Sequence, residues 1–464
     1  ATPPGQGGIA VIRVSGKDAI RLVAEAWRGK NLAEVASHTA HLGKYVSTEG
    51  DVLDEAVATV FRGPNSFTGE DVVEIGVHGS RWIQREVVAD LIRRGAKGAG
   101  PGEFTQRAFM NGRLDLAQAE GVADLIASSS KAAHALALAQ TRGDFSRGLE
   151  TVRQELIDLA SLLELELDFS EEDVEFADRS RLETLAESLL ARVDRLAASY
   201  SSGSVLKEGV PVVIAGLPNA GKSSLLNLLV GDDKAIVSDI PGTTRDTIED
   251  TVEIDGVLFR FIDTAGLRST DDTVETLGIE RARAKMRQAR IVIWIFDPTQ
   301  PLAPQLAEYE DFRKENPEKD VIIVEGKSDI QPSATLLLED STEGLPSPVS
   351  MAMTTGEGSV SSPIRMSMTT GEGADKLRER LSATATKDFN PESEFIVTNA
   401  RHYEALIHAS AALQRALDGL RTGLSADFVA QDIREVIAHL GTITGAVTTD
   451  TLLHTIFSRF CIGK

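Results

Sequence analysis

The sequence predicts a multidomain chain with α+β and α/β parts, in which an α/β domain is inserted into a helical one. Three observations support this class. A glycine loop beginning at Gly216 stands between an apolar run and a leucine-rich helical pattern. Strand-like and helical runs alternate after this loop, as they do around parallel sheets. Alanine- and leucine-rich helical stretches lie on both sides of the region, which favours one helical domain split by an insertion.

Length and charge narrow the possible classes. A chain of 464 residues suggests two to four domains. The 48 basic and 70 acidic residues give a net charge of −22, which argues against a broad nucleic-acid-coating surface but allows RNA on a local basic patch. No apolar run has membrane-spanning length, so no membrane partner is expected. The single cysteine, Cys461, rules out an internal disulfide, and we expect a reducing, cytoplasmic location.

The first part, residues 1–113, mixes strand and helix signals and predicts a small α+β domain. Runs rich in β-branched residues predict strands at 9–14, 52–61 and 71–77. Apolar residues that recur every three or four positions predict helices at 17–27 and 80–94.

The remainder divides into three segments. Residues 114–206 have the leucine spacing of a helical bundle, and residues 381–464 return to it. Between them, residues 207–380 predict an α/β domain with a largely parallel sheet. Its expected strands are 210–215, 252–254, 258–262, 291–296 and 321–324.

The glycine loop matches the P-loop pattern G-x-x-x-x-G-K-S. Glycines let the backbone fold around phosphates, so that N–H groups at the helix start face the anion. Lys222 is expected to reach the β- and γ-phosphates, and Ser223 to hold Mg²⁺. The nucleotide-contacting residues predicted here are Gly216, Asn219, Ala220, Gly221, Lys222, Ser223 and Ser224.

Two later motifs have the order expected of switch segments in GTP-binding proteins. Asp263, Thr264, Ala265 and Gly266 end an apolar strand, where the carboxylate can hold the Mg²⁺ shell and the glycine N–H can face a γ-phosphate. Upstream, Thr243 and Thr244 lie in the polar loop Gly-Thr-Thr-Arg-Asp, where a hydroxyl can complete the Mg²⁺ shell.

Base recognition departs from the expected pattern. Asn-Lys-x-Asp should follow the strand at 321–324, but the chain has Gly326, Lys327, Ser328 and Asp329. Guanine preference through Asp329 and an altered nucleotide choice both remain open, since one lost hydrogen bond costs ~1 kcal/mol. An eight-residue segment at 351–358 nearly repeats at 366–373, and the second copy, with Ser367 and Met368, fits a base-side loop better.

The hydrolytic step has no glutamine at the usual position, because Leu267 follows Gly266. Leucine cannot orient water, so another group must do so. Glu275 is the candidate, although by residue type alone a solvated loop carboxylate is the more common case.

These motifs together resemble the MnmE (TrmE) family of tRNA-modification GTPases, almost from end to end. The resemblance also includes 63–71 (Gly-Pro-Asn-Ser-Phe-Thr-Gly-Glu-Asp), 101–105 (Pro-Gly-Glu-Phe-Thr), 114–120 and the terminal Phe460-Cys461-Ile462-Gly463-Lys464. It implies an N-terminal folate-binding domain that dimerises, a split helical domain and an inserted G domain.

The resemblance assigns further ligands within the G domain. Family members need K⁺, and Asn219, Ser238, Ile240 and Thr243 match the family's K⁺-contacting positions. Ser223 and Thr244 match its Mg²⁺ ligands. Glu275 aligns with a glutamate that acts like a general base, which strengthens its candidacy.

The resemblance also implies a folate site and a reaction. Arg13, Glu74, Arg113 and Lys464 match folate contacts, although by residue type alone ordinary surface charge is the more common explanation. The folate would be a 5-formyl- or methylene-tetrahydrofolate. With an FAD-dependent partner, MnmG (GidA), a homodimer would add an aminomethyl-type group to C5 of the wobble uridine of tRNAs. The alternatives are a non-enzymatic GTP switch that docks a partner and a relative with impaired nucleotide binding.

Overall fold

The computed structural model describes residues 2–3, 5–168, 179–232, 250–262, 286–330, 363–387, 396–458, 460 and 463. The chain forms two compact units. The first unit comprises Ala1–Ile126, Ala137–Asp194 and Glu404–Lys464, and the second comprises Ala127–Leu136 and Arg195–Tyr403. Each unit is therefore assembled from segments that are far apart in sequence.

The first unit contains an antiparallel sheet of order β1-β5-β4-β3-β2. Its strands are β1 (Ile9–Ser15), β2 (Trp27–Gly29), β3 (Thr39–Val46), β4 (Val52–Phe61) and β5 (Val72–His78). One face packs against α1 (Ala19–Ala26) and α2 (Arg81–Arg93), around buried side chains such as Ile12, Val23 and Ile75. Successive strand residues face opposite sides, so Arg13 and Glu74 lie on the face away from these helices.

The three strands and two helices expected in residues 1–113 are confirmed, with one boundary corrected. We expected the first helix to continue to Trp27, but it ends at Ala26 and Trp27 begins β2. The buried Trp27 indole packs where Gly43 has no side chain, since an added β-carbon there would lie 2.5 Å from its ring. The sequence pattern also missed β2, β3 and α3 (Glu103–Met110).

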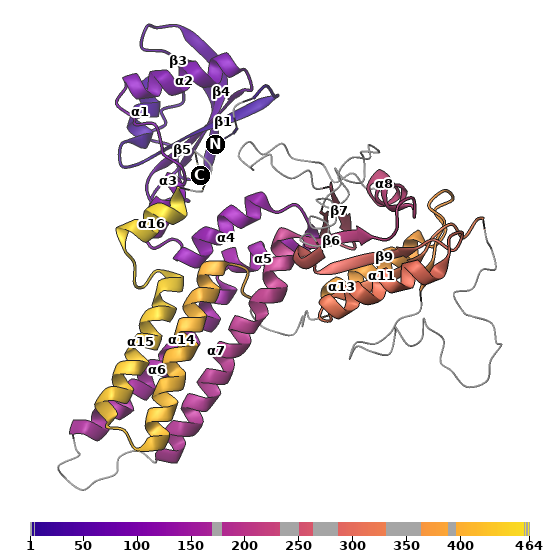
Figure 1. The fold of residues 1–464 in the computed structure, drawn as a ribbon. Coiled ribbons are helices and arrows are strands. Elements are labelled where there is room, and N and C mark those ends of the chain that lie inside the picture. Colours follow the sequence, from indigo (N-terminus) through magenta and orange to yellow (C-terminus); the bar gives the residue numbers. More distant parts are fainter. Residues whose placement is uncertain are drawn as a thin grey trace, which may run out of the picture. The chain divides into compact units, whose positions relative to one another are not determined.

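Long helices form the rest of the first unit. They are α4 (Leu116–Ala127), α5 (Lys131–Thr141), α6 (Asp144–Asp168), α7 (Arg179–Glu208), α14 (Ala400–Thr422), α15 (Ala426–Thr444) and α16 (Asp450–Phe457), of which α4, α5, α7 and α14 extend into the second unit. Figure 1 shows α6, α14 and α15 side by side. Ion pairs cross between them, including Arg415 with Asp432 and Arg434 with Glu164. The helices that we expected on both sides of the α/β region are confirmed.

The second unit is built on a six-stranded sheet of order β11-β10-β9-β6-β8-β7. Its elements are β6 (Val210–Ala215), α8 (Lys222–Asp232), β7 (Asp250–Ile254), β8 (Val257–Phe261), β9 (Ile291–Phe296), α11 (Leu302–Glu315), β10 (Asp320–Glu325), β11 (Ile364–Arg365) and α13 (Ala374–Thr386). All strand pairs are parallel except β7 with β8. The five expected strands and the largely parallel sheet are confirmed, whereas the two-residue β11 was missed.

Helices cover both faces of this sheet, which explains why its central strands β6 and β9 are wholly apolar. Leucines of α8 and α13 pack on the face that carries Ile293, and Tyr309 and Phe312 of α11 pack on the face that carries Trp294. The expected domain borders at 206 and 380 fall within α7 and α13. Leu381 and Ala385, beyond the second border, lie in the same core as Leu377.

Candidate functional site

The P-loop lies at the carboxyl end of β6, between that strand and α8. Strand β6 is flanked by β8 and β9 in the middle of the sheet. Ligands of open parallel sheets bind at the carboxyl ends of the strands, so the loop occupies the expected edge. Lys222 is the first residue of α8, and Ser223 and Ser224 follow in its first turn. Backbone N–H groups at this helix start have no intrahelical partner.

Backbone conformation decides which residues fit the loop. Gly216 has φ 137° and Gly221 has φ 99°, values that side chains rarely permit, and Asn219 has φ 62°. A β-carbon at Gly216 would also lie 2.4 Å from the Ile295 carbonyl oxygen of β9. The loop therefore packs closely on the neighbouring strand and turns sharply, which gives the concave backbone that anions occupy.

Lys222 supplies the positive charge of this loop. Its Nζ donates hydrogen bonds to the carbonyl oxygens of Gly216 (2.7 Å) and Leu217 (2.8 Å). Burial lowers the pKa of this amine, and the negative charge of Glu308 opposes that shift. Carbonyl oxygens carry only partial charge, so a phosphate would satisfy the ammonium group better. The loop, the amine and the Ser223 hydroxyl thus suit a magnesium-bound polyphosphate.

The base-side loop follows β10 and is joined to the second copy of the repeat. Ser328 N donates to Met366 O (3.2 Å), and Met366 N donates to Glu325 O (2.8 Å). Ser367 is fully buried. Met368 touches two loops, because its Cε lies 3.4 Å from a β-carbon added at Gly326 and 3.7 Å from one added at Gly221. The structure therefore places Met368 beside both the P-loop and the base-side loop.

One residue of this edge was missed by the sequence patterns. Asp297 follows β9, is 1% exposed, and accepts a hydrogen bond from Lys327 Nζ at 2.6 Å. The usable signal was its position, since a polar residue that directly follows a buried parallel strand lies at the ligand-binding edge. Phe67 and Phe104, described below, were also missed as neighbours of Arg13.

Several predicted site residues lie outside the described residues. They are Ser238, Ile240, Thr243, Thr244, Asp263, Thr264, Ala265, Gly266, Glu275, Cys461 and Lys464, and the first copy of the repeat at 351–358. Within the described ranges, no cluster of three or more His, Cys, Asp or Glu side chains could hold a metal ion. A search of the same ranges found no helix with both the length and the apolar character to cross a membrane.

In the first unit, the structure brings Arg13 and Glu74 together. They are direct partners across β1 and β5, and Arg13 Nε and Nη2 donate to Glu74 Oε1 at 2.8 and 2.6 Å. The guanidinium also lies 5.5 Å from the ring centre of Phe67 and 5.7 Å from that of Phe104. Arg113 lies next to Gly69, where an added β-carbon would be 3.2 Å from Arg113 Cγ. The arrangement offers a cation, a carboxylate and two aromatic rings in one place.

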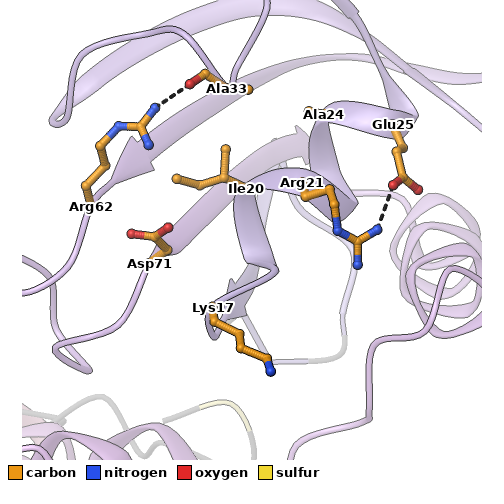
Figure 2. A pocket seen from close by; sticks show the side chains of 8 residues that line it. All are labelled: Lys17, Ile20, Arg21, Ala24, Glu25, Ala33, Arg62 and Asp71. Atoms are coloured by element: carbon orange, nitrogen blue, oxygen red, sulfur yellow. Dashed lines mark hydrogen bonds and ion pairs between the residues drawn. The ribbon is translucent and has the colours of Figure 1, made fainter.

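A hollow of about 470 Å³ lies beside α1 in the same unit (Figure 2). Its arginines are already engaged. Arg62 donates to the carbonyl oxygens of Ala33 and Val35, and Arg21 pairs with Glu25. Arg21 there has an acidic partner, whereas the Lys222 ammonium group of the P-loop bonds to uncharged carbonyl oxygens.

Comparisons with known proteins cover almost the whole chain. Residues 1–113 match the family model described as GTP-binding protein TrmE N-terminus, and residues 116–461 match the MnmE helical domain. The chain is 48% identical to the tRNA modification GTPase MnmE of Parabacteroides distasonis over 100% of this chain and 98% of that protein. It is 47% identical to that of Cytophaga hutchinsonii, covering 100% and 96%. Among solved structures, a variant of Aquifex aeolicus Era bound to GDP·AlF4⁻ matches 44% of this chain and 66% of its own, with 25% identity and a TM-score of 0.28.

Proposed function

Because this chain belongs to the MnmE family of tRNA modification GTPases, we propose that it hydrolyses GTP to GDP and phosphate and thereby acts in tRNA modification. The observation that carries the proposal is the P-loop, in which the half-buried Lys222 ammonium group donates to loop carbonyls at the carboxyl edge of a largely parallel sheet. Lys222 binds the β- and γ-phosphates, and loop N–H groups share their charge.

Ser223 and Thr244 hold Mg²⁺, which neutralises charge on the transferred phosphoryl group when bound. Asn219, Ser238, Ile240 and Thr243 hold K⁺, whose charge replaces that of an arginine finger. Asp263, Thr264, Ala265 and Gly266 contact the γ-phosphate side, and Glu275 activates the attacking water. Lys327, Asp329, Ser367 and Met368 form the base side, with Asp329 accepting the guanine N–H protons.

The first unit binds the tail and pterin of a 5-formyl- or methylene-tetrahydrofolate through Arg13, Glu74, Arg113 and Lys464. Arg13 and Glu74 support this assignment because they pair with each other on one face of the sheet, and the Arg13 guanidinium lies beside the rings of Phe67 and Phe104. Aromatic rings beside a cation suit a flat heterocycle with an anionic tail.

The proposal extends to partners and organisation. The chain acts in the cytoplasm as a homodimer. With the FAD-dependent MnmG (GidA), it installs an aminomethyl-type group on C5 of the wobble uridine, using the folate carbon. Residues 1–113 form the folate-binding and dimerisation domain, residues 207–380 the G domain, and residues 114–206 with 381–464 the helical domain.

The decisive experiment measures GTP hydrolysis in matched KCl and NaCl buffers, with ATP as the control nucleotide and Lys222→Ala as the control variant. We expect K⁺-stimulated, GTP-specific turnover that falls by about a hundredfold or more in Lys222→Ala, as when a charge-stabilising group is removed. Equal, slow rates in both salts, without binding of 5-formyltetrahydrofolate, would favour the docking switch instead. Turnover of neither nucleotide would point to impaired nucleotide binding.

A further inference from the structure

Asp297 sits at the centre of a hydrogen-bond cluster between β9 and α11. Its Oδ1 accepts from Thr299 N (3.0 Å) and Thr299 Oγ1 (2.6 Å), and its Oδ2 accepts from Lys327 Nζ. Gln305 fixes the backbone from the other side, donating to Asp297 O (2.9 Å) and accepting from Asp297 N (2.8 Å). Neither the backbone nor the carboxylate of Asp297 can move without breaking several of these bonds.

The Asp297 carboxylate is held in its ionised form. Burial alone would raise the pKa of Asp297, but the hydrogen bonds from Lys327 and Thr299 outweigh it and hold the pKa below its usual value. Asp297 therefore stays ionised at neutral pH, and a buried ionised carboxylate needs its partners. Lys327 supplies the opposite charge with a side chain that is 29% exposed.

Backbone hydrogen bonds hold the residues on either side of Lys327, since Gly326 N donates to Phe296 O and Ser328 N donates to Met366 O. Lys327 itself needs a side-chain partner because its own backbone conformation is unfavourable. It has φ 55°, a left-handed conformation that is unfavourable for a lysine, and it follows Gly326, which has no side chain to tie the loop. We infer that Asp297 is the positioning residue of the base-side loop, fixing Lys327 in place of the side chain that Gly326 lacks.

The inference rests on the proposed GTP site and adds a residue to it. A lysine that is already fixed before the nucleotide arrives loses less side-chain entropy on binding. The bond between Asp297 and Lys327 therefore strengthens nucleotide binding through preorganisation. Asp297 acts through Lys327 and touches no nucleotide itself. Its effect should therefore vanish once the Lys327 ammonium group is gone.

The test is a double-mutant cycle of Asp297→Asn and Lys327→Met, with Asp311→Asn as a matched control. Asp311 carries the same charge on α11 but is 72% exposed and pairs with Lys314. The measurements are the dissociation rate of a fluorescent GDP, the KM and kcat for GTP, and the thermal midpoint of each variant. Asparagine keeps an oxygen for the Thr299 bonds, which favours a folded variant.

We expect Asp297→Asn to raise the GDP dissociation rate about tenfold, the effect of one hydrogen bond to a charged group. The KM for GTP should rise more than kcat falls, and Asp311→Asn should stay within about twofold of the parent chain. In the Lys327→Met background, Asp297→Asn should change the rate by less than about twofold.

Two results would overturn the inference. One is a folded Asp297→Asn variant with an unchanged dissociation rate. The other is an equal effect in both backgrounds, which would make Asp297 a purely structural residue. Absence of guanine-nucleotide binding in the parent chain is a different result, because it would overturn the proposed function itself.

Discussion

The P-loop and the base-side loop lie at the same sheet edge but are built in different ways. The P-loop is defined by backbone: two glycines and Asn219 take left-handed conformations, and Gly216 packs against the Ile295 carbonyl oxygen. The base-side loop depends on partners that are distant in sequence, one of them held through side chains. Lys327 depends on Asp297, 30 residues earlier, and Ser328 bonds to Met366.

The difference explains how each loop tolerates change. A backbone-built loop needs its glycines, because no other residue fits the conformation or the space. A loop fixed by side chains can lose one group if another takes its place. Gly326 in place of the expected asparagine is therefore compatible with an ordered base-side loop, whereas a change at Gly216 is not compatible with an ordered P-loop.

The largest predicted effect follows from Gly216→Ala. A β-carbon there would lie 2.4 Å from the Ile295 carbonyl oxygen, at a φ that alanine disfavours. We expect the second unit to lose at least about 3 kcal/mol of unfolding free energy, together with nucleotide binding. Calorimetry with and without GDP identifies the affected transition, because only the nucleotide-binding unit is shifted by ligand.

Gly231→Ala is the matched control for that experiment. Gly231 lies in α8, and an added β-carbon meets no atom within 4 Å. Gly231→Ala should leave the unfolding transition of the second unit unchanged or raise the unfolding free energy of that unit by up to about 1 kcal/mol. If Gly216→Ala behaved like Gly231→Ala, the backbone-built description of the P-loop would be wrong.

A smaller effect is expected when the missing side chain is restored. At Gly326, an added β-carbon lies 3.4 Å from Met368 Cε and 3.5 Å from Ala220 O, and its φ is not left-handed. The β-carbon of an asparagine therefore fits at about van der Waals distance, and we expect its amide to donate to the Ala220 carbonyl and tie the two loops together. We expect Gly326→Asn to tighten GDP binding by about threefold to tenfold, measured by calorimetric titration.

Gly326→Ala separates the amide from the added bulk. It should bind GDP like the parent chain, because it adds a β-carbon without a donor. Equal gains from alanine and asparagine would mean that backbone stiffening, and not a bond between the loops, limits affinity.

The same contrast explains what the sequence could predict. The P-loop and most strands of both sheets follow local patterns, since each glycine or apolar run constrains its own neighbourhood. Asp297 could not be assigned a partner, because its bond to Lys327 depends on β9 and β10 being neighbours in the sheet. The place of Trp27 in β2 also could not be predicted from its sequence neighbours, since its indole packs in a gap at Gly43 on another strand. The second copy of the repeat, which the sequence favoured as the base-side loop, directly follows β11 in the structure.

The last prediction concerns the charge of Lys222. Burial lowers the pKa of its free amine below 10.5, with Glu308 opposing the shift, and a bound polyphosphate would raise that pKa. Nucleotide affinity should therefore be complete below the free pKa and fall as pH rises through it, by no more than about tenfold per pH unit. Nucleotide binding in the alkaline range should be accompanied by proton uptake, which is measurable by calorimetry in buffers of different ionisation enthalpy.

Lys222→Arg is the control, because an arginine side chain cannot lose its charge. The pH dependence of nucleotide affinity that remains in this variant should come only from ionisation of the guanine base, which affects both proteins equally. A parent profile identical to that of Lys222→Arg would show that the bonds to Gly216 and Leu217 keep the amine charged, and the P-loop would then be preorganised by a side chain as the base-side loop is.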